Sequence, residues 1–122
     1  MPLYYLPNAR SEVQRAKMAE LEAAGICCLC PDGIAPVHTV GIWSVVVNAF
    51  PYEGARRHLL IVPKFHLTSV DGLSESSWLS LHAAIAWVVE SFRLSSYTVK
   101  VRCGDVRETG GTIEHLHVHV TA

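Results

Sequence analysis

The chain has 122 residues, 50% of them hydrophobic, which is enough for one compact core and too few for two ordinary domains. Charged residues make up 17% of the sequence and the formal net charge is −1, so no broad attraction to nucleic acid or to an anionic membrane is expected. No apolar run reaches the roughly 18 residues that span a bilayer, and the N-terminus lacks the pattern of a signal peptide. We therefore expect one soluble domain over residues 1–122, located in the cytoplasm, with no nucleic-acid polymer and no membrane as partner.

A helix is predicted close to the N-terminus. Ser11 and Gln14 have the spacing of a capping box, in which the two side chains satisfy unpaired donors at a helix start. Residues 12–24 are mostly good helix formers, and Gly25 supplies the left-handed residue that ends a helix. Residues 1–25 are thus predicted to form an N-terminal helical segment, followed by the rest of the domain over residues 26–122.

The cysteines indicate a metal site. Three of the four fall within four positions of one another, which is a poor disulfide framework, and an intracellular chain would keep them reduced. Cys27 and Cys30 flank two residues in a turn-rich segment and form half of a tetrahedral zinc site, for which His66 and His115 are the best further candidates. The alternative, that these cysteines pack as small hydrophobic residues, stays open. Cys28 could replace one of these ligands, although a side chain adjacent to Cys27 usually points away from it.

The rest of the chain predicts strands around one long helix. β-Branched residues and alternation indicate strands, and the stretch from Ser74 to about Leu94 has helical periodicity without proline or glycine. A glycine turn is expected directly before the final strand. The predicted strands are 43–48, 58–63, 97–102 and 115–120, and the glycine turn is 109–112.

The final predicted strand, His115–Val120, alternates histidine with apolar residues. Successive side chains of a strand point to opposite faces, so the three imidazoles stand in a row, each about 7 Å from the next, while the apolar residues meet the core. Such a row can bind a metal or attack phosphorus. The preceding glycines favour phosphate, because backbone donors in a glycine turn suit phosphate oxygens, although a plain hairpin turn explains the glycines equally well on its own.

With these residues in hand, the chain resembles the histidine triad (HIT) family. The resemblance rests on His115–Val120, on Asn48 at a strand end, on the segment 58–66 and on the helix start at 71–74. It implies an α+β fold with a mainly antiparallel sheet of about five strands and two helices, and a homodimer. It also implies hydrolysis or transfer of nucleoside monophosphate groups, with dinucleoside polyphosphates and nucleoside phosphoramidates as substrates.

The resemblance assigns roles to individual residues. His117 would be the nucleophile that attacks the α-phosphorus and forms a nucleotidyl-histidine, with a backbone carbonyl expected to hold its other ring nitrogen. Phosphate oxygens would be held by His119, Thr112 and the backbone near Gly111, and Asn48 would lie near the ribose. In zinc-bearing members the ion is structural, and its ligands would correspond to Cys27, Cys30, His66 and His115. His58 receives no functional role.

Two departures from the family pattern leave other functions open. Relatives carry an amide side chain thirteen residues before the nucleophile, where this chain has Gly104, so one phosphate contact is expected to be lost. The sequence also ends soon after the triad, and a segment that shapes the leaving-group pocket is expected to be missing. A nucleotide-binding or zinc-stabilised interaction module with little turnover is therefore the main alternative. A metalloenzyme in which all three histidines bind one ion is another.

Overall fold

Five strands form one antiparallel sheet in the computed structural model, which describes residues 2–122. The strand order is β1-β2-β3-β5-β4, and every neighbouring pair is antiparallel. The elements are α1 (Glu12–Ala24), β1 (His38–Val40), β2 (Trp43–Val47), β3 (His58–Pro63), α2 (Glu75–Ser91), β4 (Thr98–Val101), α3 (Val106–Thr109) and β5 (Val118–Thr121). The α+β class and the five-stranded antiparallel sheet are confirmed, with three helices in place of the two expected.

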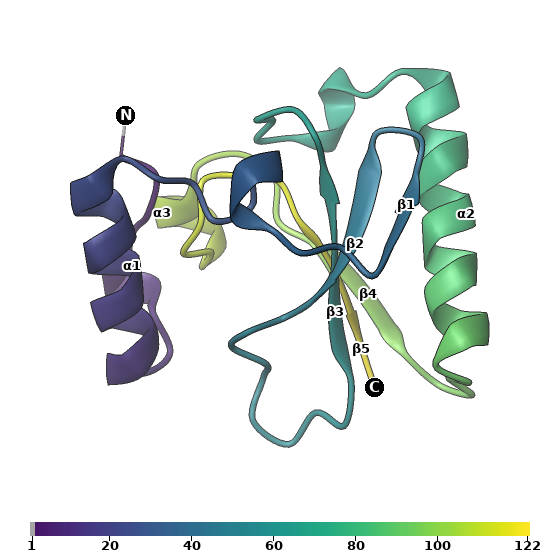
Figure 1. Cartoon of the computed structure of the whole chain (residues 1–122), viewed down its shortest axis with the longest axis horizontal. Helices are drawn as coiled ribbons and strands as arrows, with labels where there is room; N and C mark the ends of the chain where they lie inside the picture. The colour runs from purple at the N-terminus through teal and green to yellow at the C-terminus, as the bar shows by residue number, and fades with distance from the viewer. Residues whose placement is uncertain (1) are drawn as a thin grey trace.

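The sheet has one mostly apolar face and one that carries more polar side chains. In β3 and β5 the odd- and even-numbered residues divide between the two faces, as a pleated strand requires. Ile61, Val118 and Val120 pack with α2, whereas Leu60 and His119 lie on the opposite face. Figure 1 shows α2 along one side of the sheet and α1 with α3 beyond the other. On the polar side lie the N-terminal part of the chain with α1, the short helix α3 and loops.

The N-terminal segment is tied to the loop that precedes β5. The backbone N–H of Tyr5 donates to the carbonyl of Thr112 (2.7 Å), and the Asn8 amide donates to the carbonyls of Val106 (2.9 Å) and Gly111 (2.8 Å). These bonds hold the start of α1 beside the histidine motif.

The predicted cap of this helix is confirmed. The Gln14 N–H donates to the Ser11 hydroxyl (3.0 Å), and the Gln14 side-chain oxygen accepts from the N–H of Arg10 (2.8 Å). The helix ends at Gly25, whose φ is 70°.

The segment before the last strand differs from the prediction. β5 begins at Val118, three residues later than expected, because the N–H of Leu116 donates to the carbonyl of Leu67 (2.6 Å) in a loop instead of to a neighbouring strand. The expected glycine turn is the end of a helix, since α3 ends at Thr109 and Gly110 takes the left-handed conformation with φ 83°. Strand β1 was not predicted, because it has only three residues, too few for its alternating burial to stand out in the sequence.

The helices are too short or too polar to cross a bilayer, a finding that covers residues 2–122.

Candidate functional site

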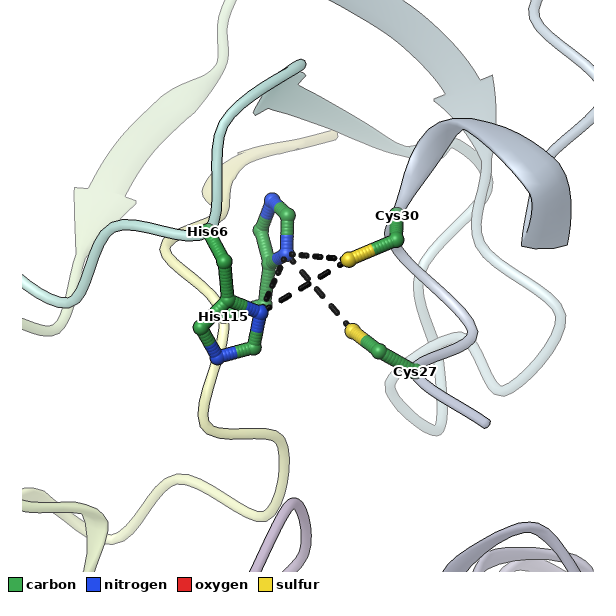
Figure 2. Close-up of side chains that lie close together, drawn as sticks. All are labelled: Cys27, Cys30, His66 and His115. Atoms are coloured by element: carbon green, nitrogen blue, oxygen red, sulfur yellow. Dashed lines mark hydrogen bonds between the residues drawn. The ribbon is translucent and has the colours of Figure 1, made fainter. Parts of the chain in front are cut away.

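Four side chains converge to form a group that can hold a metal ion. The ligand atoms of Cys27, Cys30, His66 and His115 all lie within 4.8 Å of one another, and Figure 2 shows both thiols and both rings pointing to one centre. The His115 Nδ1 atom lies 3.6 Å from each sulfur and 3.2 Å from His66 Nδ1. A tetrahedral zinc with ordinary bond lengths separates sulfur from nitrogen by about 3.6 Å and nitrogen from nitrogen by about 3.3 Å. The donor set therefore fits a tetrahedral ion, and the predicted grouping of these four residues is confirmed.

The cysteine turn depends on a close backbone approach. The N–H of Gly33 donates to the carbonyl of Cys30 (2.8 Å), which closes the turn. A Cβ at position 33 would lie 2.7 Å from the carbonyl oxygen of Cys27, so only glycine fits there. Cys28 is outside the metal-ligating group, as predicted, and its N–H donates to the Tyr4 hydroxyl (2.9 Å).

His115 and His117 present different ring nitrogens. His115 donates from Nε2 to the carbonyl of Pro63 (2.9 Å), which leaves the lone pair of Nδ1 for the metal-ligating group. His117 donates from Nδ1 to the carbonyl of His115 (2.6 Å), so its lone pair is on Nε2. Burial lowers the pKa of His117 and favours the neutral ring, although the bond to the His115 carbonyl acts in the opposite direction. The predicted bond to a backbone carbonyl is present.

His58 and His119 form a buried relay that sequence reasoning missed. The backbone N–H of Tyr52 donates to Nδ1 of His58 (3.0 Å), so the His58 proton is on Nε2 and points at Nδ1 of His119 (2.8 Å). This arrangement makes Nδ1 of His119 an acceptor and leaves its Nε2–H as a donor. That Nε2 atom is buried and has no hydrogen-bond partner among residues 2–122. His119 is therefore set to donate to a ligand.

The histidines do not form the evenly spaced row that was expected. The ring centres of His117 and His119 are 4.8 Å apart, closer than the spacing of about 7 Å expected for a strand, and His117 lies before the start of β5. The ring of His115 turns instead to the metal-ligating group. The predicted sidedness of the apolar residues is confirmed, since Leu116, Val118 and Val120 all pack in the core beneath α2.

One polar pocket collects the residues predicted to bind phosphate. It is lined by Asn48, Gly111, Thr112, His117 and His119. Within residues 2–122, the backbone N–H groups of Gly111 and Thr112 form no hydrogen bond. Gly111 and Thr112 line the same pocket as His117 and as His119, whose Nε2–H has no partner, so the pocket suits an anion.

An apolar cavity of about 330 Å³ adjoins the polar pocket. The two share Asn48, Phe50, Leu60 and Ile113 as lining residues. The side-chain oxygen of Asn48 accepts from the N–H of Phe50 (2.9 Å), which fixes the loop between the two spaces. An aromatic or heterocyclic group in the apolar cavity would thus place an attached anion next to His117.

Two arginines also line the polar pocket, and sequence analysis passed over both. Arg10 comes from the N-terminal segment and Arg102 follows β4. Gly104, where relatives carry an amide, adds no side chain to this pocket, and its N–H donates to the carbonyl of Thr68 (2.8 Å). Arg102 thus adds a charged side chain to a pocket to which Gly104 adds none.

The HIT domain family model matches residues 43–122. The chain belongs to the HIT domain family. Among solved structures it resembles a HIT-like protein, with a TM-score of 0.61, 20% identity, and coverage of 71% of this chain and 83% of the other. A HIT family hydrolase from Legionella pneumophila has a TM-score of 0.60, 22% identity and coverage of 79% and 91%. A HIT family hydrolase from Clostridium thermocellum has a TM-score of 0.57, 27% identity and coverage of 71% and 76%. No curated protein matches the chain.

Proposed function

We propose that the chain is a nucleotide hydrolase or nucleotidyl transferase that acts at the α-phosphate through a covalent nucleotidyl-histidine. The observation that carries the proposal is the paired orientation of two imidazoles in one pocket. His117 presents a lone pair on Nε2 and His119 presents an Nε2–H donor. A nucleophile beside a donor for the phosphate oxygens is the arrangement that covalent phosphoryl chemistry needs.

His117 would attack and its surroundings would stabilise the charge. As its Nε2 bonds to phosphorus, the bond from phosphorus to the leaving group breaks and that group takes the electron pair. The ring then carries positive charge, which the His115 carbonyl at 2.6 Å from Nδ1 stabilises. Water, or another acceptor, then attacks phosphorus, loses a proton and releases the mononucleotide and neutral His117.

Phosphate and nucleoside would occupy the two adjoining spaces. The free N–H groups of Gly111 and Thr112 and the His119 donor would hold the phosphate oxygens. The base would enter the apolar cavity, whose volume of about 330 Å³ is within the usual range for small-molecule sites. Asn48 lines both spaces and would therefore lie near the ribose.

We propose zinc as a structural ion held by Cys27, Cys30, His66 and His115. Two thiolates and two imidazoles form a closed tetrahedral set, which leaves no position for substrate. When bound, the ion would supply rigidity and no chemistry. Because the carbonyl of His115 orients His117, a fixed His115 keeps the nucleophile in position.

The expected homodimer is also proposed. Strand β4 is at one edge of the sheet, and no other strand in residues 2–122 pairs with its outer side. Exposed Val99 on this strand would be covered by a second copy. Light scattering at several concentrations tests this: a monomer mass throughout would contradict it.

The test of function uses two substrates and a matched histidine control. The purified chain is incubated with diadenosine polyphosphate and with adenosine phosphoramidate, and AMP release is followed by chromatography. His117→Ala should abolish release, and His82→Ala, which removes an exposed histidine on α2, should not. Equal rates for wild type and His117→Ala would refute the nucleophile. Tight AMP binding without turnover of any substrate would favour the alternative, a nucleotide-binding module.

A further inference from the structure

Arg10 and Arg102 bring positive charge to the polar pocket, and no carboxylate of the described residues neutralises this charge. Both line the pocket together with His117 and His119. Neither forms an ion pair with a carboxylate within residues 2–122, where the ion pairs are confined to Arg15, Lys17 and Arg107. A pair of uncompensated guanidinium groups in a pocket is an anion site unless something else explains their placement.

Both arginines are held in place by neutral partners around Tyr52. Arg102 donates from Nε to the carbonyl of Thr109 (2.9 Å) and from Nη1 to the Tyr52 hydroxyl (3.2 Å). The Arg10 guanidinium lies 4.6 Å from the centre of the Tyr52 ring and donates to the carbonyl of Phe50. A guanidinium has five N–H donors, so each arginine keeps donors for a ligand.

The positive charges around Tyr52 repel one another. Burial, together with the charge of Arg102, lowers the pKa of Arg10, although Tyr52 partly offsets this. A third cation, Lys100, lies with its Nζ 4.4 Å from the Tyr52 ring centre and pairs in register with His119. Holding like charges together disfavours the empty pocket, and a bound polyanion would relieve the repulsion.

The negative charge of one phosphate is too small to balance the positive charges of Arg10 and Arg102. An α-phosphate that is linked on both sides carries about one negative charge, and the proposed function already assigns it to His119 and the backbone near Thr112. The arginines therefore match a second anionic group next to the attacked phosphorus.

We propose that Arg10 and Arg102 bind the anionic leaving group, so that the site selects nucleotides whose α-phosphate is joined to further phosphate over those joined to an amine. This rests on the proposed function. When His117 attacks, the bond from the α-phosphorus to the bridging oxygen breaks and the electron pair stays on the departing phosphate. The guanidinium groups stabilise the charge that develops there. A phosphoramidate, whose nitrogen takes a proton from water as the bond to phosphorus breaks, loses a neutral amine and gains nothing from them.

The test compares two substrates across matched arginine variants. We measure kcat/KM for diadenosine triphosphate and for adenosine phosphoramidate with wild type, Arg10→Ala, Arg102→Gln and the control Arg15→Ala. Arg15 is on the exposed side of α1 in a surface pair with Glu12, so its loss makes the same charge change outside the pocket. Each pocket variant should lower kcat/KM about tenfold or more for the triphosphate and less than about threefold for the phosphoramidate. Equal losses on both substrates, or no loss on either, would overturn the proposal.

A binding measurement separates this inference from the proposed function. Calorimetry gives the affinities of AMP and ADP for wild type, Arg10→Ala and Arg15→Ala. ADP should bind more tightly than AMP to wild type and to Arg15→Ala, and this preference should vanish in Arg10→Ala. An unchanged preference in Arg10→Ala contradicts the role of Arg10 even if catalysis is present. If no substrate is turned over but the preference for ADP still depends on Arg10, the proposed catalytic function is refuted and the role of the arginine is kept.

Discussion

His58 makes the stability of the fold depend on pH in a way that one substitution removes. Burial, followed by the charges of Arg10 and Lys100, lowers the pKa of His58 from 6.5 to about 4. The unfolded chain therefore binds a proton at a higher pH than the folded chain. The contribution of His58 to stability is complete above pH 6.5 and is lost as the pH falls toward 4.

The magnitude follows from the two pKa values. At pH 5 the unfolded histidine is about 97% protonated and the folded one about 9%, whereas at pH 7.5 both are mostly neutral. Linkage then gives a loss of about 2 kcal/mol in the free energy of unfolding between pH 7.5 and 5 from this one group. A domain of this size has a total stability of only about 5–15 kcal/mol, so the loss is measurable.

Urea unfolding of wild type and His58→Gln at the two pH values tests the reasoning. The variant should lose about 2 kcal/mol less than wild type on going from pH 7.5 to 5. Any loss of metal at acidic pH occurs in both proteins and cancels in the difference. If the two proteins lose stability in parallel, His58 is not the cause of the pH dependence and the lowered pKa assigned to it is wrong.

Three further outcomes are expected. Cys27→Ser, or treatment with a chelator, should lower both the melting temperature and the activity, whereas elemental analysis of His117→Ala should still find one zinc per chain. A melting temperature that is unchanged by the chelator would contradict a structural role for the ion. Gly33→Ala should weaken zinc binding about tenfold or more in a competition titration, because the added Cβ would lie 2.7 Å from the Cys27 carbonyl oxygen. The control Gly72→Ala should bind zinc as tightly as wild type, because no atom lies within 4 Å of a Cβ at that position. Leu59→Ala should lower the free energy of unfolding, measured by chemical denaturation, by about 2–5 kcal/mol, because Leu59 is only 2% exposed in the core. A decrease of less than about 1 kcal/mol would argue against this packing.

Local patterns predicted the parts of the site that lie close together in the sequence. The alternation in His115–Val120 indicated which side chains meet the core, and the spacing of Cys27 and Cys30 indicated a metal turn. Pairing these cysteines with His66 and His115 needed a choice among distant residues, and the structure confirms it.

Contacts that depend on strand pairing could not be predicted in the same way. His58 meets His119 because β3 pairs with β5 and Leu60 is opposite His119, a register that neither strand encodes alone. Arg10 reaches the pocket because Asn8 and Tyr5 tie the N-terminal segment to the loop before β5. The start of β5 was misplaced because the N–H of Leu116 is bonded to Leu67, a long-range bond that interrupts a regular alternation.

The main-chain carbonyl of His115 has a consequence for how variants at this position can be interpreted. Every residue at position 115 keeps a carbonyl, so mutation can displace the acceptor that orients His117 but cannot delete it. A series of substitutions at 115 should therefore give graded rates that follow how far the backbone shifts. The activity of variants at position 115 would thus decrease gradually as the backbone shifts, whereas any variant at position 117 without the imidazole would be inactive.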